Sequence, residues 1–184
     1  MDAIAFETET GRRYGAVHAL IPDTSLICVL HIGAEKTGVG VGDASVPRIL
    51  PALAIGSEKT ARAFFKHTPA SPLELETAIE TVEGEVMRAR PLIPAGATLY
   101  TTDAAVREIA VLSGVGDAVP MQLSVEAMER TFDRLTSVAG GRPASHEGLP
   151  VSTTFAATLL ILREFMHHLQ FSSITVVDTP APTS

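Results

Sequence analysis

The apolar residues follow a strand-like pattern in the first third of the chain. A nearly continuous apolar run from Leu26 to Gly33 is typical of a central strand that is covered on both faces. The segment 36–42 alternates glycine with threonine and valine, which predicts a strand approached closely on one face. A third strand is predicted over 49–55, and Pro51 places it at an edge or a bulge. The short connections predict an antiparallel meander.

Helical spacing dominates the remaining sequence. The clearest helix start has Ser71 as N-cap, Pro72 at the first helical position and Glu74 completing a capping box. Gly140 and Gly141 predict the end of a later helix that Ser124 begins. The pattern predicts helices over 10–20, 57–66, 71–90, 104–112, 124–140 and 153–170, and further strands over 98–102 and 174–177.

This order of elements predicts the fold class. A three-stranded meander followed by alternating helices and strands gives an α/β protein, with helices on both faces of a five-stranded mixed sheet. The order resembles a ribonuclease-H-like or actin-like ATPase lobe, a similarity that does not itself define a function. Because no repeat or linker interrupts the pattern, we expect residues 1–178 to form a single lobe and residues 179–184 to be a disordered tail.

Composition narrows the classes of function. Of 184 residues, 46% are apolar and 19% are charged, which is typical of a compact globule and not of a disordered chain. A net charge of -7 without a basic cluster disfavours nucleic-acid binding. The longest apolar run, 155–162, is much shorter than the roughly 20 residues of a membrane span, and no signal peptide is evident, so we expect a cytoplasmic protein that binds no membrane.

Several segments together resemble one protein family. They are HIGAEKTG at 31–38, LAIG at 53–56, LYTTDAAVREIA at 99–110, LSVEAMERTFDRL at 123–135, HEGLPVSTTFAATLLIL at 146–162 and ITVVD at 174–178. In order and apolar pattern they resemble the second lobe of the phosphatase domain of the exopolyphosphatase / guanosine pentaphosphate phosphohydrolase (Ppx/GppA) family, which has an actin-like (ASKHA) fold. The resemblance implies two loops that bind phosphate through backbone N–H groups.

The first of these loops departs from the family pattern. The resemblance implies an acid at the strand end, three glycines, a serine and a closing glutamate. This chain has His31 at the strand end and Gly38 at the closing position. Only the first of the three glycines is kept, and the remnant of the phosphate loop consists of His31, Gly33, Ala34, Glu35, Lys36 and Thr37.

The second loop departs in the same direction. The family's glycine-glycine-threonine turn is replaced by Asp103, Ala104 and Ala105, and its remnant comprises Thr102, Asp103, Ala104 and Arg107. Glu35 and Asp103 add negative charge where phosphate would lie. Two unit charges about 4 Å apart repel by roughly 4 kcal/mol at an effective dielectric constant near 20. The resemblance also implies a first lobe, with a catalytic glutamate, that these 184 residues do not contain.

The remaining candidates each have two interpretations. Glu35 and Asp103 could jointly hold Mg²⁺, or both could be solvated loop carboxylates, which we favour because neither lies in a known metal-binding spacing. His31 could be a ligand or general base, although a strand-end histidine bonded to a backbone carbonyl is the simpler interpretation. Lys36 is expected to form a weak surface pair with Glu35, and Arg107 either points to the cleft or is solvated.

Cys28, the only cysteine, is expected to be a small buried apolar residue, because Cys28 and His31 point to opposite faces of the strand. The glycines of 36–42 indicate either a close ligand or a helix packed over the hairpin. His167 and His168 are expected to lie in the last turn of a helix.

Three functions remain open. The first is a degenerate family member without catalytic residues, metal or cofactor, which acts as an interaction or regulatory module, either as a homodimer or with a protein carrying the first lobe. The second is a Mg²⁺-dependent exopolyphosphatase or guanosine pentaphosphate phosphohydrolase, active only as an oligomer or with a separate first lobe. The third is a nucleotide-binding lobe of the pilus-assembly or cell-division actin-like type, because HIGAEKTGVGVGD also resembles the D-I-G-x-x-x-T hairpin of those proteins.

Overall fold

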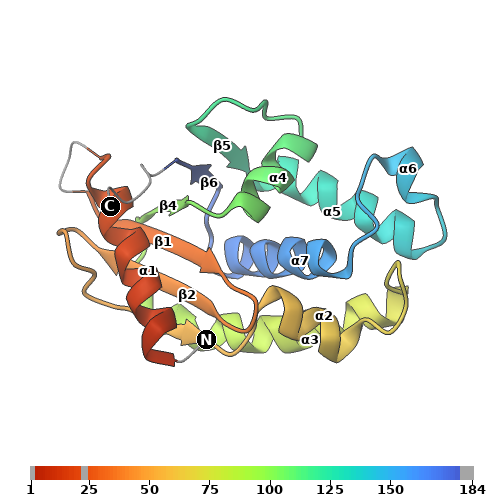
Figure 1. The fold of residues 1–184 in the computed structure, drawn as a ribbon, viewed down its shortest axis with the longest axis horizontal. Helices are drawn as coiled ribbons and strands as arrows, with labels where there is room; N and C mark the ends of the chain where they lie inside the picture. Colours follow the sequence, from red (N-terminus) through yellow and green to blue (C-terminus); the bar gives the residue numbers. More distant parts are fainter. Residues whose placement is uncertain (1–2, 22–24, 179–184) are drawn as a thin grey trace.

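The structure, a computed structural model, describes residues 3–21 and 25–178 (Figure 1). Within this part of the chain the helices are α1 (Ala3–His18), α2 (Ser57–Phe64), α3 (Pro72–Ala89), the 3₁₀ turn η1 (Arg90–Leu92), α4 (Ala104–Leu112), α5 (Val125–Ala139), α6 (Ala144–Glu147) and α7 (Thr153–His168). The strands are β1 (Ile27–Ile32), β2 (Thr37–Gly42), β3 (Ala52–Leu53), β4 (Thr98–Thr101), β5 (Met121–Ser124) and β6 (Ser173–Val176). The predicted tail, 179–184, lies outside the described residues.

The six strands form one mixed sheet in the order β3-β2-β1-β4-β6-β5. Strands β1, β2 and β3 pair antiparallel, which confirms the predicted meander, whereas β1, β4 and β6 are parallel neighbours. The predicted count of five strands is wrong, because β5 pairs antiparallel with β6 at the other edge. This strand has only four residues, of which Met121 and Leu123 are buried. So short an alternation of apolar and polar residues cannot be recognised as a strand when a helix, α5, begins directly after it.

The third strand is shorter than predicted. Only Ala52 and Leu53 form β3, although Ile49 makes an isolated bridge to Val41. The carbonyls of Ile49 and Pro51 accept hydrogen bonds from the β2 amides of Val41 and Val39. Because proline has no N–H group, Pro51 belongs at an edge of the sheet, and it directly precedes the edge strand β3.

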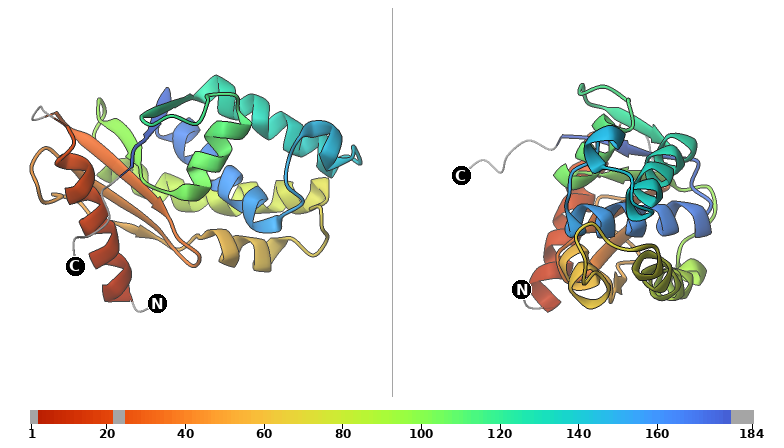
Figure 2. Two further views of the ribbon diagram at one scale, coloured as in Figure 1. Left: turned by 45° about the horizontal axis from the view of Figure 1, so that its top comes forward. Right: turned by 90° about the vertical axis from the view of Figure 1, so that its right-hand side faces the viewer.

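Helix α1 covers one face of the sheet and lies across β1 and β2 (Figures 1 and 2). The glycines of β2 make this close packing possible. A Cβ atom on Gly38 would lie 2.2 Å from Thr10 Oγ1, and one on Gly40 would lie 3.0 Å from Tyr14 Cβ. The glycine alternation therefore reflects a packed helix. This helix begins seven residues before the predicted start. In the segment before Thr10, Phe6 is buried whereas Ile4 is 72% exposed, so the apolar residues there do not mark one buried face.

The opposite face of the sheet is buried by the remaining helices, so helices cover both faces, as predicted (Figure 2). Helix α7 is the centre of this layer, and it packs against α2, α3, α4 and α5. Its residues from Phe155 to Leu162 are all buried, as its central position in this layer requires. Helix α6 interrupts the segment 142–152, which the pattern predicted to be a loop.

Local capping agrees with the sequence. Ser71 Oγ accepts a hydrogen bond from the Glu74 amide, and the Glu74 carboxylate accepts one from the Ser71 amide, so the predicted capping box is present. Ser124 caps α5 through the Ala127 amide. Among the described residues, none of the helices has both the length and the apolar character needed to cross a membrane.

Candidate functional site

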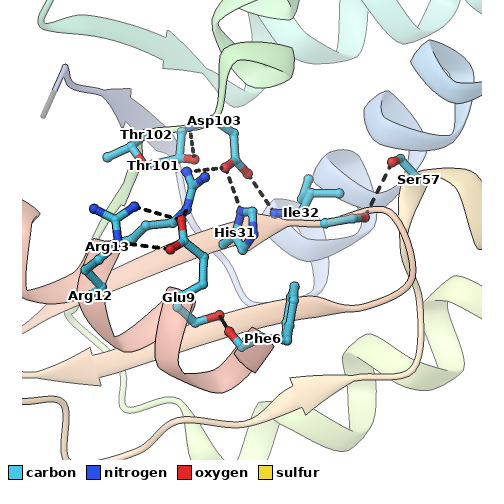
Figure 3. A network of polar contacts seen from close by, with 12 residues as sticks. Phe6, Glu9, Arg12, Arg13, His31, Ile32, Ser57, Thr101, Thr102 and Asp103 are labelled. Atoms are coloured by element: carbon cyan, nitrogen blue, oxygen red, sulfur yellow. Dashed lines mark hydrogen bonds and ion pairs between the residues drawn. The ribbon is translucent and has the colours of Figure 1, made fainter. Parts of the chain in front are cut away.

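The carboxyl ends of two parallel strands bring the two predicted loops together. Strands β1 and β4 are paired in parallel, so the loop after β4 lies beside the end of β1. His31 is the fifth residue of β1, and Asp103 directly precedes α4. Ligand sites in α/β proteins commonly lie at such strand ends. The structure therefore places His31, Thr102 and Asp103 in one cluster, as the resemblance implied (Figure 3).

The Asp103 carboxylate is the centre of this cluster. Its Oδ2 accepts a hydrogen bond of 2.7 Å from the Ile32 amide. Its Oδ1 lies 2.8 Å from His31 Nδ1 and 3.0 Å from Arg13 Nη1. The side chain is 6% exposed, so the expectation of a solvated loop carboxylate is wrong for Asp103. Three polar groups from α1 and β1 compensate the cost of burying its charge.

Helix α1 supplies the cation of the cluster. Besides Asp103, Arg13 Nη1 contacts Thr102 Oγ1 at 2.7 Å, and Arg13 Nε contacts Glu9 Oε1 at 2.7 Å. Hydrogen bonds from Arg12 and Arg13, although opposed by desolvation, lower the pKa of Glu9 to about 2. Glu9 therefore remains ionised at neutral pH and holds Arg13 from one side while Asp103 holds it from the other (Figure 3).

The position of His31 corrects the sequence interpretation. Its Nδ1 faces the Asp103 carboxylate, not a backbone carbonyl. Since a carboxylate only accepts hydrogen bonds, Nδ1 carries a hydrogen in this contact. The imidazole stacks on the ring of Phe6 with centroids 5.3 Å apart. Cys28 is fully buried in the core on the other face, and burial raises the pKa of its thiol, as expected for a small apolar residue.

The first loop is a tight turn whose backbone contacts α2. The Gly33 amide donates to the Lys36 carbonyl at 2.9 Å. The Gly33 carbonyl accepts from the Ser57 amide, and the Ala34 carbonyl accepts from the amides of Glu58 and Lys59. The hairpin therefore satisfies the N-terminal amides of α2, the groups that would otherwise be available to an anion.

Gly56 permits this contact. A Cβ atom at that position would lie 2.5 Å from the Ala34 carbonyl oxygen. Thr37, at the other end of the loop, is buried, and its hydroxyl donates to the Ile55 carbonyl at 2.8 Å. The hydroxyl is thus used within the meander and does not face a ligand.

The charged tip of the hairpin differs from the prediction. Glu35 is exposed and pairs with Arg62 of α2 at 3.0 Å, so the expected pair with Lys36 is wrong. Glu35 is the solvated carboxylate of the two, as predicted. Arg107 neither points to a cleft nor is simply solvated, because it contacts the carboxylates of Asp117 and Asp178 at 3.0 and 3.3 Å.

Helix α4 begins differently from α2. Asp103 is its N-cap residue, yet the Asp103 side chain makes no capping bond, because it is directed to β1. Within the described part of the chain, the amides of Ala104, Ala105 and Val106 have no hydrogen-bond acceptor. Ala104 and Ala105 are exposed residues, whereas Val106 is buried. Of the two predicted phosphate loops, the second therefore has backbone N–H groups at the start of α4 that make no hydrogen bond within the described residues.

A cavity of about 240 Å³ lies beside this helix start, between α2, α4 and α7. Its wall carries the hydroxyl residues Ser57, Ser152, Thr154 and Thr158 together with the carboxylates of Glu58 and Glu108. Ser152 Oγ is already engaged as the cap of α7 through the Phe155 amide. The wall therefore offers hydroxyl groups and negative charge, but no lysine or arginine lines it.

The loop residues do not form a Mg²⁺ site of the kind the fold family would use. Mg²⁺ needs carboxylate oxygens that are free to coordinate it. The Asp103 oxygens already face a guanidinium, an imidazole and an amide, and the Glu35 carboxylate faces Arg62. Neither carboxylate has an oxygen without a donor, so no step is assigned to a metal at these loops.

Sequence analysis missed Phe6, Glu9 and Arg13 as parts of this cluster. A signal existed, since Glu9 and Arg13 have the i, i+4 spacing of a helical ion pair. Because the helix was predicted to begin at residue 10, Phe6 and Glu9 fell outside it. No local pattern indicates that Arg13 reaches residues 102 and 103, about 90 positions later.

Comparisons with known proteins give evidence only at the level of structure. No protein-family model matches the sequence, and no curated protein matches it.

Several solved structures share the fold. A Ppx/GppA enzyme from Aquifex aeolicus superposes with a TM-score of 0.76 at 19% identity, over 94% of this chain and 60% of that chain. An exopolyphosphatase from Cytophaga hutchinsonii gives a TM-score of 0.69 at 12% identity, over 95% of this chain and 60% of that chain. An exopolyphosphatase-like protein gives 0.70 at 11% identity, over 92% and 63%.

The chain thus spans about 60% of the length of the structures that it matches. At such identities the similarity establishes the fold and leaves activity open. Over nearly its whole described length, this chain has the actin-like fold of Ppx/GppA phosphatases, as its sequence pattern predicted.

Proposed function

We propose that this chain is a degenerate Ppx/GppA-like protein that has no phosphatase activity of its own and acts as an interaction or regulatory module. The Asp103 carboxylate is the observation that carries the proposal. It binds the Ile32 amide, His31 and Arg13 at the strand ends where the fold family would place phosphate. The chain thus supplies its own anion to those donors.

The hairpin supports the same conclusion. The amides of Ser57, Glu58 and Lys59 donate to carbonyl oxygens of the turn, at 2.9 to 3.0 Å. Phosphate binding there would require these hydrogen bonds to break, and each one contributes about 1 kcal/mol net. The loss of affinity would come in addition to the negative charge of Glu35 at the tip of the hairpin.

A hydrolysis assay on the purified chain tests the proposal. We expect no Mg²⁺-dependent phosphate release from polyphosphate or guanosine pentaphosphate above a no-protein blank. Asp103→Asn serves as a matched variant, because it removes the internal charge and keeps the side-chain shape. Release by the unmodified chain that Asp103→Asn changes would contradict the proposal, because that carboxylate would then take part in the reaction.

An interaction module needs a partner, and we propose either a second copy of the chain or a protein that carries the unmatched lobe of the fold. About 40% of the length of the superposed structures is not matched by this chain, which is consistent with a surface that faces another lobe. Sedimentation velocity at micromolar concentration tests the first form, for which we expect a dimer. A strictly monomeric chain would exclude the homodimer at that concentration.

The N-terminus of α4 favours a second candidate, a Mg²⁺-dependent phosphoanhydride hydrolase that is active only with another lobe or subunit. The amides of Ala104 to Val106 have no acceptor among the described residues, and hydroxyl groups line the adjacent cavity. Helix N-termini bind phosphate through such amides.

Ala104→Pro separates the two candidates. Proline is tolerated at the first position of a helix and removes one N–H group, and the extended conformation of Asp103 suits a following proline. If α4 binds phosphate, Ala104→Pro weakens binding of inorganic phosphate, whereas the control Ala104→Gly keeps the N–H group and the binding. If neither the unmodified chain nor the glycine variant binds phosphate at millimolar concentration, the second candidate is excluded for the isolated chain.

A further inference from the structure

Three side chains that can bind a metal ion meet between helices α3 and α7, away from the strand ends. Glu164 and His168 are four residues apart on α7 and therefore lie on one face of that helix. Glu83 reaches them from α3, which packs along α7 (Figure 1). One ligand atom from each of the three lies within 4.8 Å of the other two.

The separations fit a tetrahedral metal site. His168 Nε2 lies 3.0 Å from Glu164 Oε2 and 3.8 Å from Glu83 Oε1. Two ligand atoms bound to zinc at about 2.1 Å, with a tetrahedral angle between them, are about 3.4 Å apart. The two separations from His168 lie on either side of this value, within about 0.4 Å of it, and the two carboxylate oxygens lie within 4.8 Å of each other. We propose that Glu83, Glu164 and His168 bind a divalent transition-metal ion, Zn²⁺, with water completing the coordination.

The environment of Glu164 supports a cation there. This carboxylate is 2% exposed, and its Oε1 lies 2.6 Å from Arg163 Nη1. That contact fixes the carboxylate and directs Oε2 toward His168. Second-shell hydrogen bonds of this kind orient the ligands of a metal. The Glu164 carboxylate is therefore preorganised for metal binding, unlike the carboxylate of a flexible surface ion pair.

The charge balance of the same region is negative. Arg163 is shared between Glu164 and Glu129, whose Oε2 it contacts at 3.0 Å, while Glu83 adds a third carboxylate. Within the described residues, the buried Oε1 of Glu129 accepts no hydrogen bond. Two carboxylates thus share the Arg163 guanidinium, Glu83 adds a third negative charge beside His168, and a divalent ion would neutralise the excess.

The ligand types favour Zn²⁺ over Mg²⁺. Zinc accepts imidazole nitrogen and carboxylate oxygen in four-coordinate sites, whereas Mg²⁺ prefers six oxygen ligands. Zinc binds the lone pair of a neutral imidazole, so His168 would carry its single ring hydrogen on Nδ1 while Nε2 binds the ion. The Cys28 thiol cannot compete for the ion, because it is fully buried in the sheet core.

Titration of the purified chain with Zn²⁺ tests the proposal, read by calorimetry and by competition with a zinc-sensitive dye. The variants are His168→Gln and Glu83→Gln, since Glu83 is 47% exposed and its change leaves the core intact. The matched control is His167→Gln, whose imidazole is 59% exposed and lies 3.9 Å from Glu129 Oε1. Circular dichroism confirms that each variant is folded. The result does not depend on whether the chain hydrolyses phosphate.

We expect one Zn²⁺ to bind per chain and millimolar Mg²⁺ not to displace it. The affinity for Zn²⁺ should fall at least about tenfold in both ligand variants, because even second-shell substitutions cause losses of this size. His167→Gln should bind as the unmodified chain does. No zinc binding by the unmodified chain would overturn the proposal and leave the cluster as an ion-pair network. Equal affinity in His168→Gln, or an equal loss in His167→Gln, would also overturn it.

Discussion

The imidazole of His31 and the carboxylate of Asp103 lie 2.8 Å apart, at the ends of two parallel strands. The sequence resemblance implies an acid at the first of these positions and a glycine at the second. In this chain His31 lies at the first position and Asp103 at the second. The carboxylate is therefore in the loop after β4 instead of on β1, and Arg13 of α1 also contacts it.

This relationship makes Asp103 a structural residue whose removal should be costly. Asp103→Ala would leave the partly buried His31 without its anion, Arg13 with Glu9 as its remaining carboxylate and the Ile32 amide without an acceptor. Removing one partner of a buried charge pair costs roughly 3 to 5 kcal/mol, and because Arg13 is 23% exposed we expect about 3 kcal/mol. Urea unfolding followed by circular dichroism measures the change.

The control for that experiment is Asp117→Ala, which breaks a contact with Arg107 at a carboxylate that is 73% exposed. Exposed pairs contribute between 0 and about 1 kcal/mol, so its midpoint should hardly move. Equal effects of the two substitutions would show that Asp103 is not held as a buried ion-pair partner.

Local patterns were sufficient for most of the fold. The capping box at Ser71, the edge position of Pro51 and the meander follow from hydrogen-bonding rules that operate over a few residues. Strand β5 was missed because four residues with two buried positions do not distinguish a strand from a helix start. The early start of α1 was missed because the apolar residues of its first turns do not share one buried face: Phe6 is buried, whereas Ile4 is exposed.

The site was predictable only in part, for a different reason. The resemblance named the two phosphate-loop remnants, and the parallel pairing of β1 and β4 brings the ends of the preceding strands side by side. It could not indicate the partners of each charge. Arg13 reaches Asp103 across 90 positions, and Glu35 pairs with Arg62 instead of its neighbour Lys36. Such pairings depend on the packing of α1 and α2, which no local pattern contains.

The glycines of β2 give a second prediction. In Gly38→Ala the new Cβ would lie 2.2 Å from Thr10 Oγ1 and 3.0 Å from Thr10 Cβ, so α1 would have to move away from the sheet. We expect a loss of about 1 to 3 kcal/mol in the free energy of unfolding, as overpacking usually costs. Faster proteolysis within α1 should accompany it.

Gly84→Ala in α3 is the matched control for the glycine experiment. A Cβ there would meet no atom within 4 Å, and alanine favours a helix over glycine by up to about 1 kcal/mol. This variant should therefore be more stable than the unmodified chain in the same urea experiment. If Gly38→Ala were equally stabilising, α1 would not pack on β2 as described.

Acid should weaken the start of α3. Hydrogen bonds from the Ser71 backbone, with further ones from His67 and the Lys66 amide, lower the pKa of Glu74 from 4.5 to about 2. A lowered folded-state pKa means that its contribution to stability is fully present above about pH 4.5 and is lost as the pH falls toward 2. Glu74→Gln keeps a capping side chain and removes the ionisation. The stability difference between the two proteins, from urea midpoints, should be constant from pH 7 to 5, shrink below 4.5 and vanish near 2. A difference that does not change with pH would contradict this assignment.

We expect the hairpin not to bind phosphate, either because the Glu35 charge repels it or because the amides of α2 are already occupied. The substitution Glu35→Gln distinguishes these two reasons. If repulsion by its charge were the main obstacle, Glu35→Gln would create a site for inorganic phosphate. We expect no such gain, because the Gly33 and Ala34 carbonyls still occupy the amides of α2 and because Arg62 already offsets the charge of an exposed carboxylate. The dissociation constant for phosphate, from calorimetry at low salt, should change by less than about fivefold, which corresponds to about 1 kcal/mol. A tenfold or larger gain would mean that charge alone closes the loop and that its backbone can still bind an anion.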